Sequence, residues 1–229
     1  MSIIIPIYNE EKTSLTVIEK LIALETNFEK ELIIVDDGST DKSLEILKGI
    51  NDSKVTLITH ESNRGKGSAI RTAIPYAKGR VVAIQDADLE YSPEELMGLI
   101  EYVLFGDYDI VFGSRFMKEN PCIYRRYLLG NKIMSFIVTC VTLQRITDSY
   151  TCYKVFRKDI ISTFPLFSKG FEIEAELSVY AALCKARFRE MPISYNPRRL
   201  KEGKKIKWVD MLKGVYMIIK TRVKLFYKR

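Results

Sequence analysis

Short runs of β-branched and aliphatic residues alternate with longer amphipathic segments through the first half of the chain. This alternation is typical of βαβ units, which build a mainly parallel sheet with helices on its faces. The runs that predict strands span residues 2–7, 32–35, 55–59, 81–84 and 110–112. The pattern therefore predicts an α/β fold for this half.

Helical spacing and start signals fill the gaps between these strands. Apolar residues over 15–22 recur at helical spacing, and Asp41 is a suitable N-cap for a second helix. A third helix is expected over 68–78, with a kink at Pro75.

The fourth helix has the fullest set of signals. Ser92 is its expected cap, Pro93 stands in its first turn, and Glu95 would close a capping box. Gly106 would end it. After residue 121 the pattern loosens, with helices expected over 127–143 and 172–184 and short strands over 153–156 and 191–195.

The composition sets one segment apart from the rest. The chain has 229 residues, 47% of them apolar, which is enough for one domain with a substantial core. Its formal charge is +7, but residues 1–197 hold 24 Lys and Arg against 27 Asp and Glu. Residues 198–229 hold 12 against 2, so the basic excess belongs to the C-terminal segment.

That segment mixes apolar and cationic residues at roughly helical spacing, namely Lys207, Trp208, Met211, Leu212, Lys213, Val215, Tyr216, Ile219, Lys220 and Arg222. Such a helix would lie on an anionic membrane surface, pack on the domain with its basic face exposed, or mediate homo-oligomer formation. We expect no nucleic-acid partner, because zinc-finger spacing is missing and the acidic remainder would repel a phosphate backbone.

Cysteine usage and the apolar runs indicate a cytoplasmic protein. The four cysteines form no CxxC pair, which fits reduced thiols, and the N-terminus lacks a cationic leader and cleavage site. The longest apolar run, 133–143, has 11 residues, whereas a helix needs about 20 to span a bilayer. We therefore expect at most a peripheral membrane contact.

Polar side chains follow all five strands of the predicted sheet. In chain order they are Tyr8, Asn9, Glu10, Asp36, Asp37, Asn63, Asp86, Asp88, Ser114 and Arg115. One such cluster is commonly a turn or a cap, but five clusters on one edge of a sheet indicate a ligand site.

The segment Asp86-Ala87-Asp88 is the sharpest of these clusters. Alternate residues of an extended segment point the same way, so its two carboxylates share one side. They end a buried run, where they would repel one another without a cation, and carboxylates suit Mg²⁺ or Mn²⁺. Glu90 continues the alternation as a third candidate ligand.

The segment Gly65-Lys66-Gly67-Ser68 opens the third helix with two glycines and a cation. It would place free amides and Lys66 near an anion, or would only open the helix. The spacing of a P-loop is missing.

These clusters stand in a familiar order. The motifs are Ile5-Pro6-Ile7-Tyr8-Asn9-Glu10, Val35-Asp36-Asp37-Gly38-Ser39-Thr40-Asp41, Asn63-Arg64-Gly65-Lys66-Gly67, Asp86-Ala87-Asp88 and Gly113-Ser114-Arg115. The likeness continues through residues 148–156 and 192–195. Together they resemble the family-two glycosyltransferases, in the branch of dolichyl-phosphate mannose and glucose synthases and their polyprenyl-phosphate relatives.

The resemblance implies a GT-A fold, with a Rossmann-like, mainly parallel sheet and a C-terminal acceptor-side helical extension. Residues 1–197 would form the catalytic domain, with a nucleotide-sugar half at 1–115 and an acceptor half at 116–197. Residues 198–229 would form the basic, amphipathic segment.

The resemblance also assigns roles to residues. Those implied to hold the nucleotide sugar are Pro6, Tyr8, Glu10, Val35, Asp37, Asp86, Ala87, Asp88, Arg198, Lys204 and Lys205. Asp86, Asp88 and Glu90 would bind the metal. The implied acceptor-phosphate residues are Arg115, Arg125 and Arg126, and we expect Asp88 and Arg115 to be catalytic.

The implied reaction is transfer of a hexose-type sugar, with inversion, from a UDP or GDP sugar to a polyprenyl phosphate. A phosphate monoester has a second pKa of about 6 and needs no general base at neutral pH. A glycan hydroxyl does need one, and Glu172, Glu174 or Asp148 would have to supply it. Both acceptors stay open at this point, as does a non-catalytic nucleotide-sugar binder.

Overall fold

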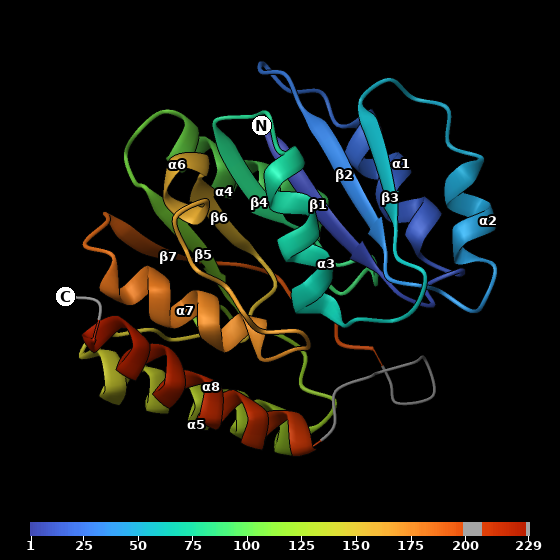
Figure 1. The fold of residues 1–229 in the computed structure, drawn as a ribbon. Helices are drawn as coiled ribbons and strands as arrows, with labels where there is room; N and C mark the ends of the chain where they lie inside the picture. Colours follow the sequence, from blue (N-terminus) through green and yellow to red (C-terminus); the bar gives the residue numbers. More distant parts are fainter. Residues whose placement is uncertain (199–207, 228–229) are drawn as a thin grey trace.

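The computed structural model describes residues 1–198 and 208–227, in which seven strands form one sheet (Figure 1). The strands are β1 (Ser2–Ile7), β2 (Glu31–Asp36), β3 (Val55–Thr59), β4 (Val81–Ile84), β5 (Ile110–Ser114), β6 (Lys154–Arg157) and β7 (Phe188–Pro192). Their order is β3-β2-β1-β4-β6-β5-β7. Only β6 runs antiparallel to its neighbours, so the predicted mainly parallel sheet is confirmed.

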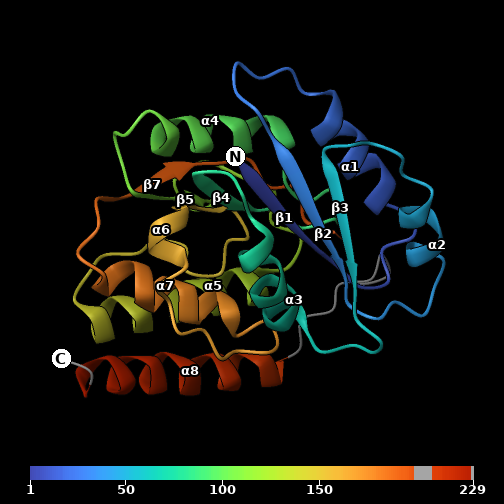
Figure 2. The same cartoon turned by 45° about the horizontal axis from the view of Figure 1, so that its top comes forward.

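Helices cover both faces of this sheet. They are α1 (Ser14–Ala23), α2 (Ser43–Lys48), α3 (Lys66–Ala73), α4 (Pro93–Leu104), α5 (Arg125–Thr142), α6 (Lys158–Ile161), α7 (Ile173–Leu183) and α8 (Trp208–Phe226). Figure 2 shows α4 over one face, with α7, α5 and α8 on the opposite side. A 3-10 turn at Ile74–Tyr76 follows α3, as the position of Pro75 leads one to expect.

Helix α7 lies between the sheet and the outer pair α5 and α8. Its Ile173 and Leu177 belong to the core that contains the sheet, whereas Ala175 and Val179 pack with Ile218 of α8. A helix that is apolar on all sides is a buried one. The extension is therefore built as a second layer of helices, and α8 is part of it.

Two local predictions were wrong because tertiary contacts overrode them. Glu95 does not close a capping box: its carboxylate accepts hydrogen bonds from the Ser194 amide at 2.7 Å and hydroxyl at 2.9 Å. The last strand spans Phe188–Pro192 rather than 191–195, because Phe188 pairs with Ile110 at the start of β5. No helix in the described ranges is long and apolar enough to cross a bilayer.

Candidate active site

A cleft of about 610 Å³ opens at the carboxyl ends of β1, β2, β4 and β5, the edge that the sequence predicts. The predicted residues that line it are Pro6, Tyr8, Glu10, Asp37, Asp86, Ala87, Asp88, Glu90, Arg115 and Arg198. Val35, on β2, is fully buried in the hydrophobic core instead. Lys204 and Lys205 fall outside the described residues.

Asp37 fixes the loop that leads into α3. Its Oδ1 accepts a hydrogen bond from the Arg64 amide at 3.0 Å, and its Oδ2 accepts one from the Gly65 amide at 2.7 Å. His60 Nδ1 lies 2.7 Å from Asp37 Oδ1, and His60 Nε2 lies 3.0 Å from Thr72 Oγ1. His60 is therefore a structural residue that holds Asp37.

Gly65 is required where it stands. Its φ of +91° is in the region that favours glycine, and a Cβ there would lie 2.4 Å from the carbonyl oxygen of Lys169. The glycine therefore lets the start of α3 approach the loop before α7, and this approach places Lys66 in the cleft.

Lys66 joins the Asp86-Ala87-Asp88 motif to α7. Its Nζ lies 2.7 Å from Asp86 Oδ1 and 2.8 Å from Glu174 Oε1. Glu174 also pairs with Lys154, which is fully buried and donates to the Ser149 carbonyl at 3.1 Å. Burial would raise the pKa of Glu174, but Lys154 and Lys66 together hold it below its usual value.

Arg198 spans the other side of the cleft. Its guanidinium donates to Glu10 Oε2 at 2.8 Å and to Asp88 Oδ2 at 3.1 Å. Glu90 accepts a hydrogen bond from the Tyr195 hydroxyl at 2.9 Å and one from the Arg198 amide at 2.8 Å. Burial and the charges of Asp86 and Glu90 raise the pKa of Asp88 to about 7.

Asp86, Asp88 and Glu90 all line the cleft, but their carboxylates do not form a metal-binding cluster. In residues 1–198 and 208–227 no three His, Cys, Asp or Glu side chains are arranged to hold a metal ion. Lys66 forms an ion pair with Asp86, and Arg198 forms one with Asp88. Carboxylate oxygens are the ligands that Mg²⁺ and Mn²⁺ prefer, so a divalent cation would fit these residues once Lys66 and Arg198 no longer pair with them.

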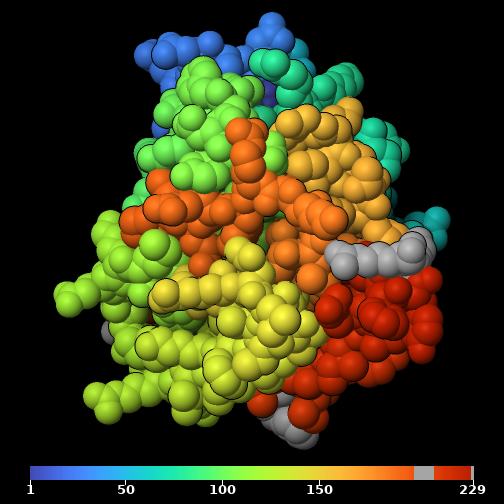
Figure 3. Space-filling view, turned by 90° about the vertical axis from the view of Figure 1, so that its left-hand side faces the viewer, coloured from blue at the N-terminus to red at the C-terminus, as the bar shows by residue number. Residues whose placement is uncertain are grey.

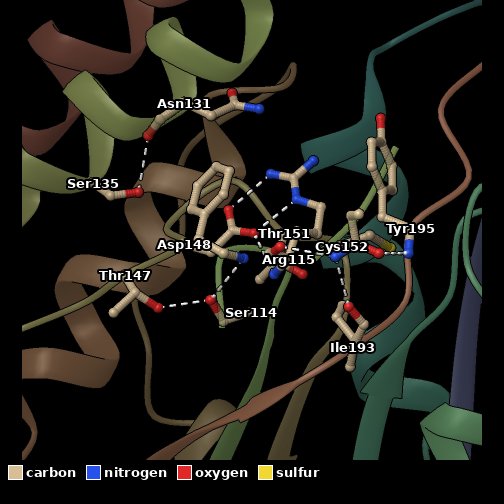
Figure 4. A network of polar contacts seen from close by, with 12 residues as sticks. Ser114, Arg115, Asn131, Ser135, Thr147, Asp148, Thr151, Cys152, Ile193 and Tyr195 are labelled. Carbon is tan, nitrogen blue, oxygen red and sulfur yellow. Dashed lines mark hydrogen bonds and ion pairs between the residues drawn. The ribbon is translucent and has the colours of Figure 1, made fainter. Parts of the chain in front are cut away.

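Arg115 and Asp148 form a buried pair at the end of β5 (Figure 4). Arg115 Nε donates to Asp148 Oδ2 at 2.7 Å, and its Nη2 donates to Oδ1 at 2.8 Å. The Arg115 amide donates to Oδ2 as well, at 3.0 Å. Both planar groups are thus fixed in orientation, in the two-pronged geometry that Arg and carboxylates favour.

Residues 2–164 match the model of a family described as Glycosyl transferase family 2. The chain belongs to this family. A dolichol-phosphate mannosyltransferase of Pyrococcus furiosus is 28% identical over 96% of this glycosyltransferase and 64% of its own length. An undecaprenyl-phosphate 4-deoxy-4-formamido-L-arabinose transferase of Pectobacterium carotovorum is 34% identical over 71% of the chain and 50% of its own length. The chain thus spans only half to two thirds of these two relatives.

Solved structures confirm the GT-A fold of the glycosyltransferase. Glucosyl-3-phosphoglycerate synthase of Mycobacterium tuberculosis, in complex with Mn²⁺, UDP and glucosyl-3-phosphoglycerate, superposes with a TM-score of 0.68. The match covers 96% of this chain and 78% of that one at 19% identity. At this identity the likeness concerns the fold alone.

The part of the chain in which the acceptor residues are predicted differs most from the expectation. Arg125 and Arg126 are exposed at the start of α5 and do not line the cleft. Tyr127 and Asn131, four residues apart on one helical face, line it instead. Arg126 stacks over the Tyr127 ring at 5.1 Å.

Sequence reasoning missed several lining residues. Tyr150, Phe171, Tyr127 and Asn131 come from α5 and from loops that meet the strand edge only in the folded chain. The four-residue spacing of Tyr127 and Asn131 was the one signal that could have indicated a shared face.

Proposed function

We propose that this glycosyltransferase moves a hexose-type sugar, with inversion, from a UDP or GDP sugar to a polyprenyl phosphate at the cytoplasmic face of a membrane. The names of the two relatives above, with dolichol phosphate and undecaprenyl phosphate as acceptors, support this choice. The proposal rests mainly on the contacts made by three carboxylates, Asp148, Glu172 and Glu174. One of them would have to act as the base if the acceptor were a hydroxyl.

Each of those three carboxylates is already engaged. Asp148 is fully buried against Arg115, and Glu174 lies between Lys66 and Lys154. Glu172 accepts hydrogen bonds from the amides of Lys169 and Gly170 at 3.1 and 3.0 Å. Asp148 and Glu174 are paired with cations, and Glu172 does not line the cleft, so a phosphate, which arrives already ionised, suits this cleft better than a glycan hydroxyl that needs a base.

The donor belongs at the ends of β1, β2 and β4. Pro6, Tyr8, Glu10 and Asp37 would contact the base and ribose, and Asp86, Ala87 and Asp88 would contact the diphosphate. Val35 supports the first group only through the core. Arg198 already reaches into this region and would turn from Glu10 and Asp88 to the donor, while Lys204 and Lys205 keep the role that the resemblance implies.

We propose Mg²⁺ or Mn²⁺ as the cofactor, held by Asp86, Asp88 and Glu90. When bound, such an ion stabilises the negative charge of the departing diphosphate. Asp86 and Asp88 can accept it once Lys66 and Arg198 release them. Both cations would then lie beside the diphosphate, where their charge is equally useful.

Arg115 would orient the acceptor phosphate, because it lines the cleft with its guanidinium fixed by Asp148. Arg125 and Arg126 would act earlier, on the approach to the cleft. The contact with the membrane would come from α8, in which Leu212, Tyr216 and Ile219 are more than half exposed. Helix α5 packs beside α8 (Figure 3) and exposes an apolar side chain of its own, Phe136.

The decisive experiment screens UDP and GDP sugars against farnesyl phosphate and against a soluble oligosaccharide, with Mn²⁺ or with a chelator. We expect transfer to the phosphate alone, and only with the metal. The Asp88→Asn variant should lose transfer, whereas Glu172→Gln should retain it. Transfer to the oligosaccharide that disappears in Glu172→Gln or Glu174→Gln would establish the hydroxyl acceptor instead, and donor binding without turnover would establish a non-catalytic binder.

A further inference from the structure

A second hollow of about 190 Å³ adjoins the cleft on its acceptor side. It shares Arg115, Tyr127, Asn131 and Tyr195 with the cleft, so the two spaces adjoin. The remainder of its wall comes from the loop after β5, from the first turns of α5 and from Pro197. We call it the side groove.

The side chains that belong to the side groove alone are mostly apolar or aromatic. Phe116, Pro121, Ile123, Tyr124 and Leu128 make up half of this wall, and Cys122 and Pro197 add to its apolar part. The exposed fraction of the Ile123 side chain is 43%, which is high for such a residue. Apolar surface that stays open beside a cleft is a place for an apolar ligand.

Two polar side chains of the side groove, Asn120 and Lys118, are already engaged. Asn120 Nδ2 donates to the carbonyls of Arg115 at 2.8 Å and Ile193 at 3.0 Å, and its Oδ1 accepts from the Tyr195 amide at 2.7 Å. Lys118 Nζ donates to Ser194 Oγ at 2.7 Å. A sugar chain needs partners for its hydroxyls, and these groups are taken, so the groove suits a hydrocarbon better than a glycan.

Two cations line the side groove. Arg115, whose charge is paired with Asp148, is on the wall shared with the cleft, and Lys132, whose Nζ lies 5.6 Å from the centroid of the Phe116 ring, is on the wall of the groove alone. An anion in the cleft with an apolar chain in the groove would match this division of charge and apolar surface. Beyond the groove, α5 exposes Leu129 and Phe136, which continue the apolar surface along the helix.

We infer that the side groove holds the first part of the apolar chain of a lipid phosphate whose phosphate lies in the cleft. The inference rests on the proposed function and adds to it the place where the acceptor chain leaves the active site. It predicts that kcat/KM depends on the length of the acceptor's apolar chain, up to the length that the side groove can hold, even when no membrane is present.

The test compares farnesyl phosphate with methyl phosphate as soluble acceptors in detergent-free buffer. In the wild-type enzyme we expect kcat/KM to be at least about tenfold higher for farnesyl phosphate, because several buried methylene groups each contribute. Ile123→Asp should raise KM for farnesyl phosphate about tenfold and leave kcat and the methyl phosphate reaction unchanged. Leu128→Ser should act in the same direction.

Met117→Asp is the matched control. Met117 stands in the same loop, is exposed to 47% against 43% for Ile123, and does not line the side groove. We expect it to leave the preference for farnesyl phosphate intact. An equal loss in Met117→Asp, an unchanged KM in Ile123→Asp and Leu128→Ser, or a wild-type enzyme without chain preference would each overturn the inference.

Calorimetric titration with farnesyl phosphate separates this inference from the proposed function. Binding that weakens in Ile123→Asp but not in Met117→Asp supports the groove even if no sugar is transferred. Transfer to both phosphates at equal efficiency supports the proposed function and refutes the groove.

Discussion

Replacing Asp148 with Asn tests how much of the acceptor wall depends on one buried ion pair. Asp148 is fully buried, and only 8% of Arg115 is exposed. Three hydrogen bonds from Arg115 end on the two carboxylate oxygens. The amide of Asp148→Asn keeps the shape of the carboxylate but leaves the guanidinium without its counter-charge.

The expected cost follows from that loss. Removing one partner of a buried ion pair costs about 3–5 kcal/mol, and we expect the lower end because the amide oxygen still accepts one hydrogen bond. A domain is stable by about 5–15 kcal/mol in total, so the loss is a large part of its stability. With a urea m-value of about 1–3 kcal/mol/M, the unfolding midpoint should fall by about 1 M or more.

The assay is urea unfolding followed by circular dichroism, applied to a double-mutant cycle. Arg115→Met should also destabilise, because it leaves the Asp148 carboxylate buried alone. The double variant should lose clearly less than the sum of the two single losses, since neither charge is then stranded. Additive losses, or an Asp148→Asn variant as stable as the wild type, would refute the assignment of this pair as a stabilising unit of the cleft wall.

Three further predictions concern the cleft and its surroundings. The folded protein raises the pKa of Asp88 to about 7, so this group binds its proton more tightly in the folded state, and its contribution to stability should be lost as pH rises from about 4 through 7. Urea unfolding without metal at pH 5 and pH 8 should show that loss, Mn²⁺ should reverse it at pH 8, and Asp88→Asn should show neither effect. Gly65→Ala should lower thermal stability by about 1–3 kcal/mol, because φ is +91° and the new Cβ would meet the Lys169 carbonyl, whereas Gly98→Ala, which meets nothing, should not. Tyr216→Ser combined with Ile219→Ser should reduce co-sedimentation with vesicles that contain anionic lipid, and retention equal to wild type would count against α8 as the membrane contact.

The predicted boundary at residue 197 remains a proposal. The packing of α8, which lies beyond this boundary, shows how it contacts the rest of the chain. Thr221 and Ile218 are fully buried in α8, and Gly214 meets Tyr150, a residue of the cleft wall. A Cβ at Gly214 would lie 1.9 Å from the Tyr150 hydroxyl. Helix α8 therefore packs directly behind the cleft.

The sequence by itself determined the strands of the first half and the edge of the sheet at which the cleft opens. Strands β1 and β3 span the predicted residues, because runs of aliphatic and β-branched residues choose an extended conformation locally. Asp37, Asp86 and Asp88 reach the cleft because each follows a strand closely, and parallel strands end at one edge. Such features depend on neighbours in sequence, so a sequence pattern can show them.

Only the tertiary structure decided which charges meet. Arg115 and Asp148 are 33 residues apart in the chain. Lys154 on β6 pairs with Glu174 on α7, 20 residues further on. No local sequence pattern indicates either pair. The Glu95 carboxylate accepts hydrogen bonds from Ser194, 99 residues away in the chain, instead of closing a capping box in its own helix. Tyr127 and Asn131 of α5 line the cleft, whereas Arg125 and Arg126 do not. Successive side chains of a helix are rotated by about 100°, and only tertiary packing decides which face of α5 is turned toward the cleft.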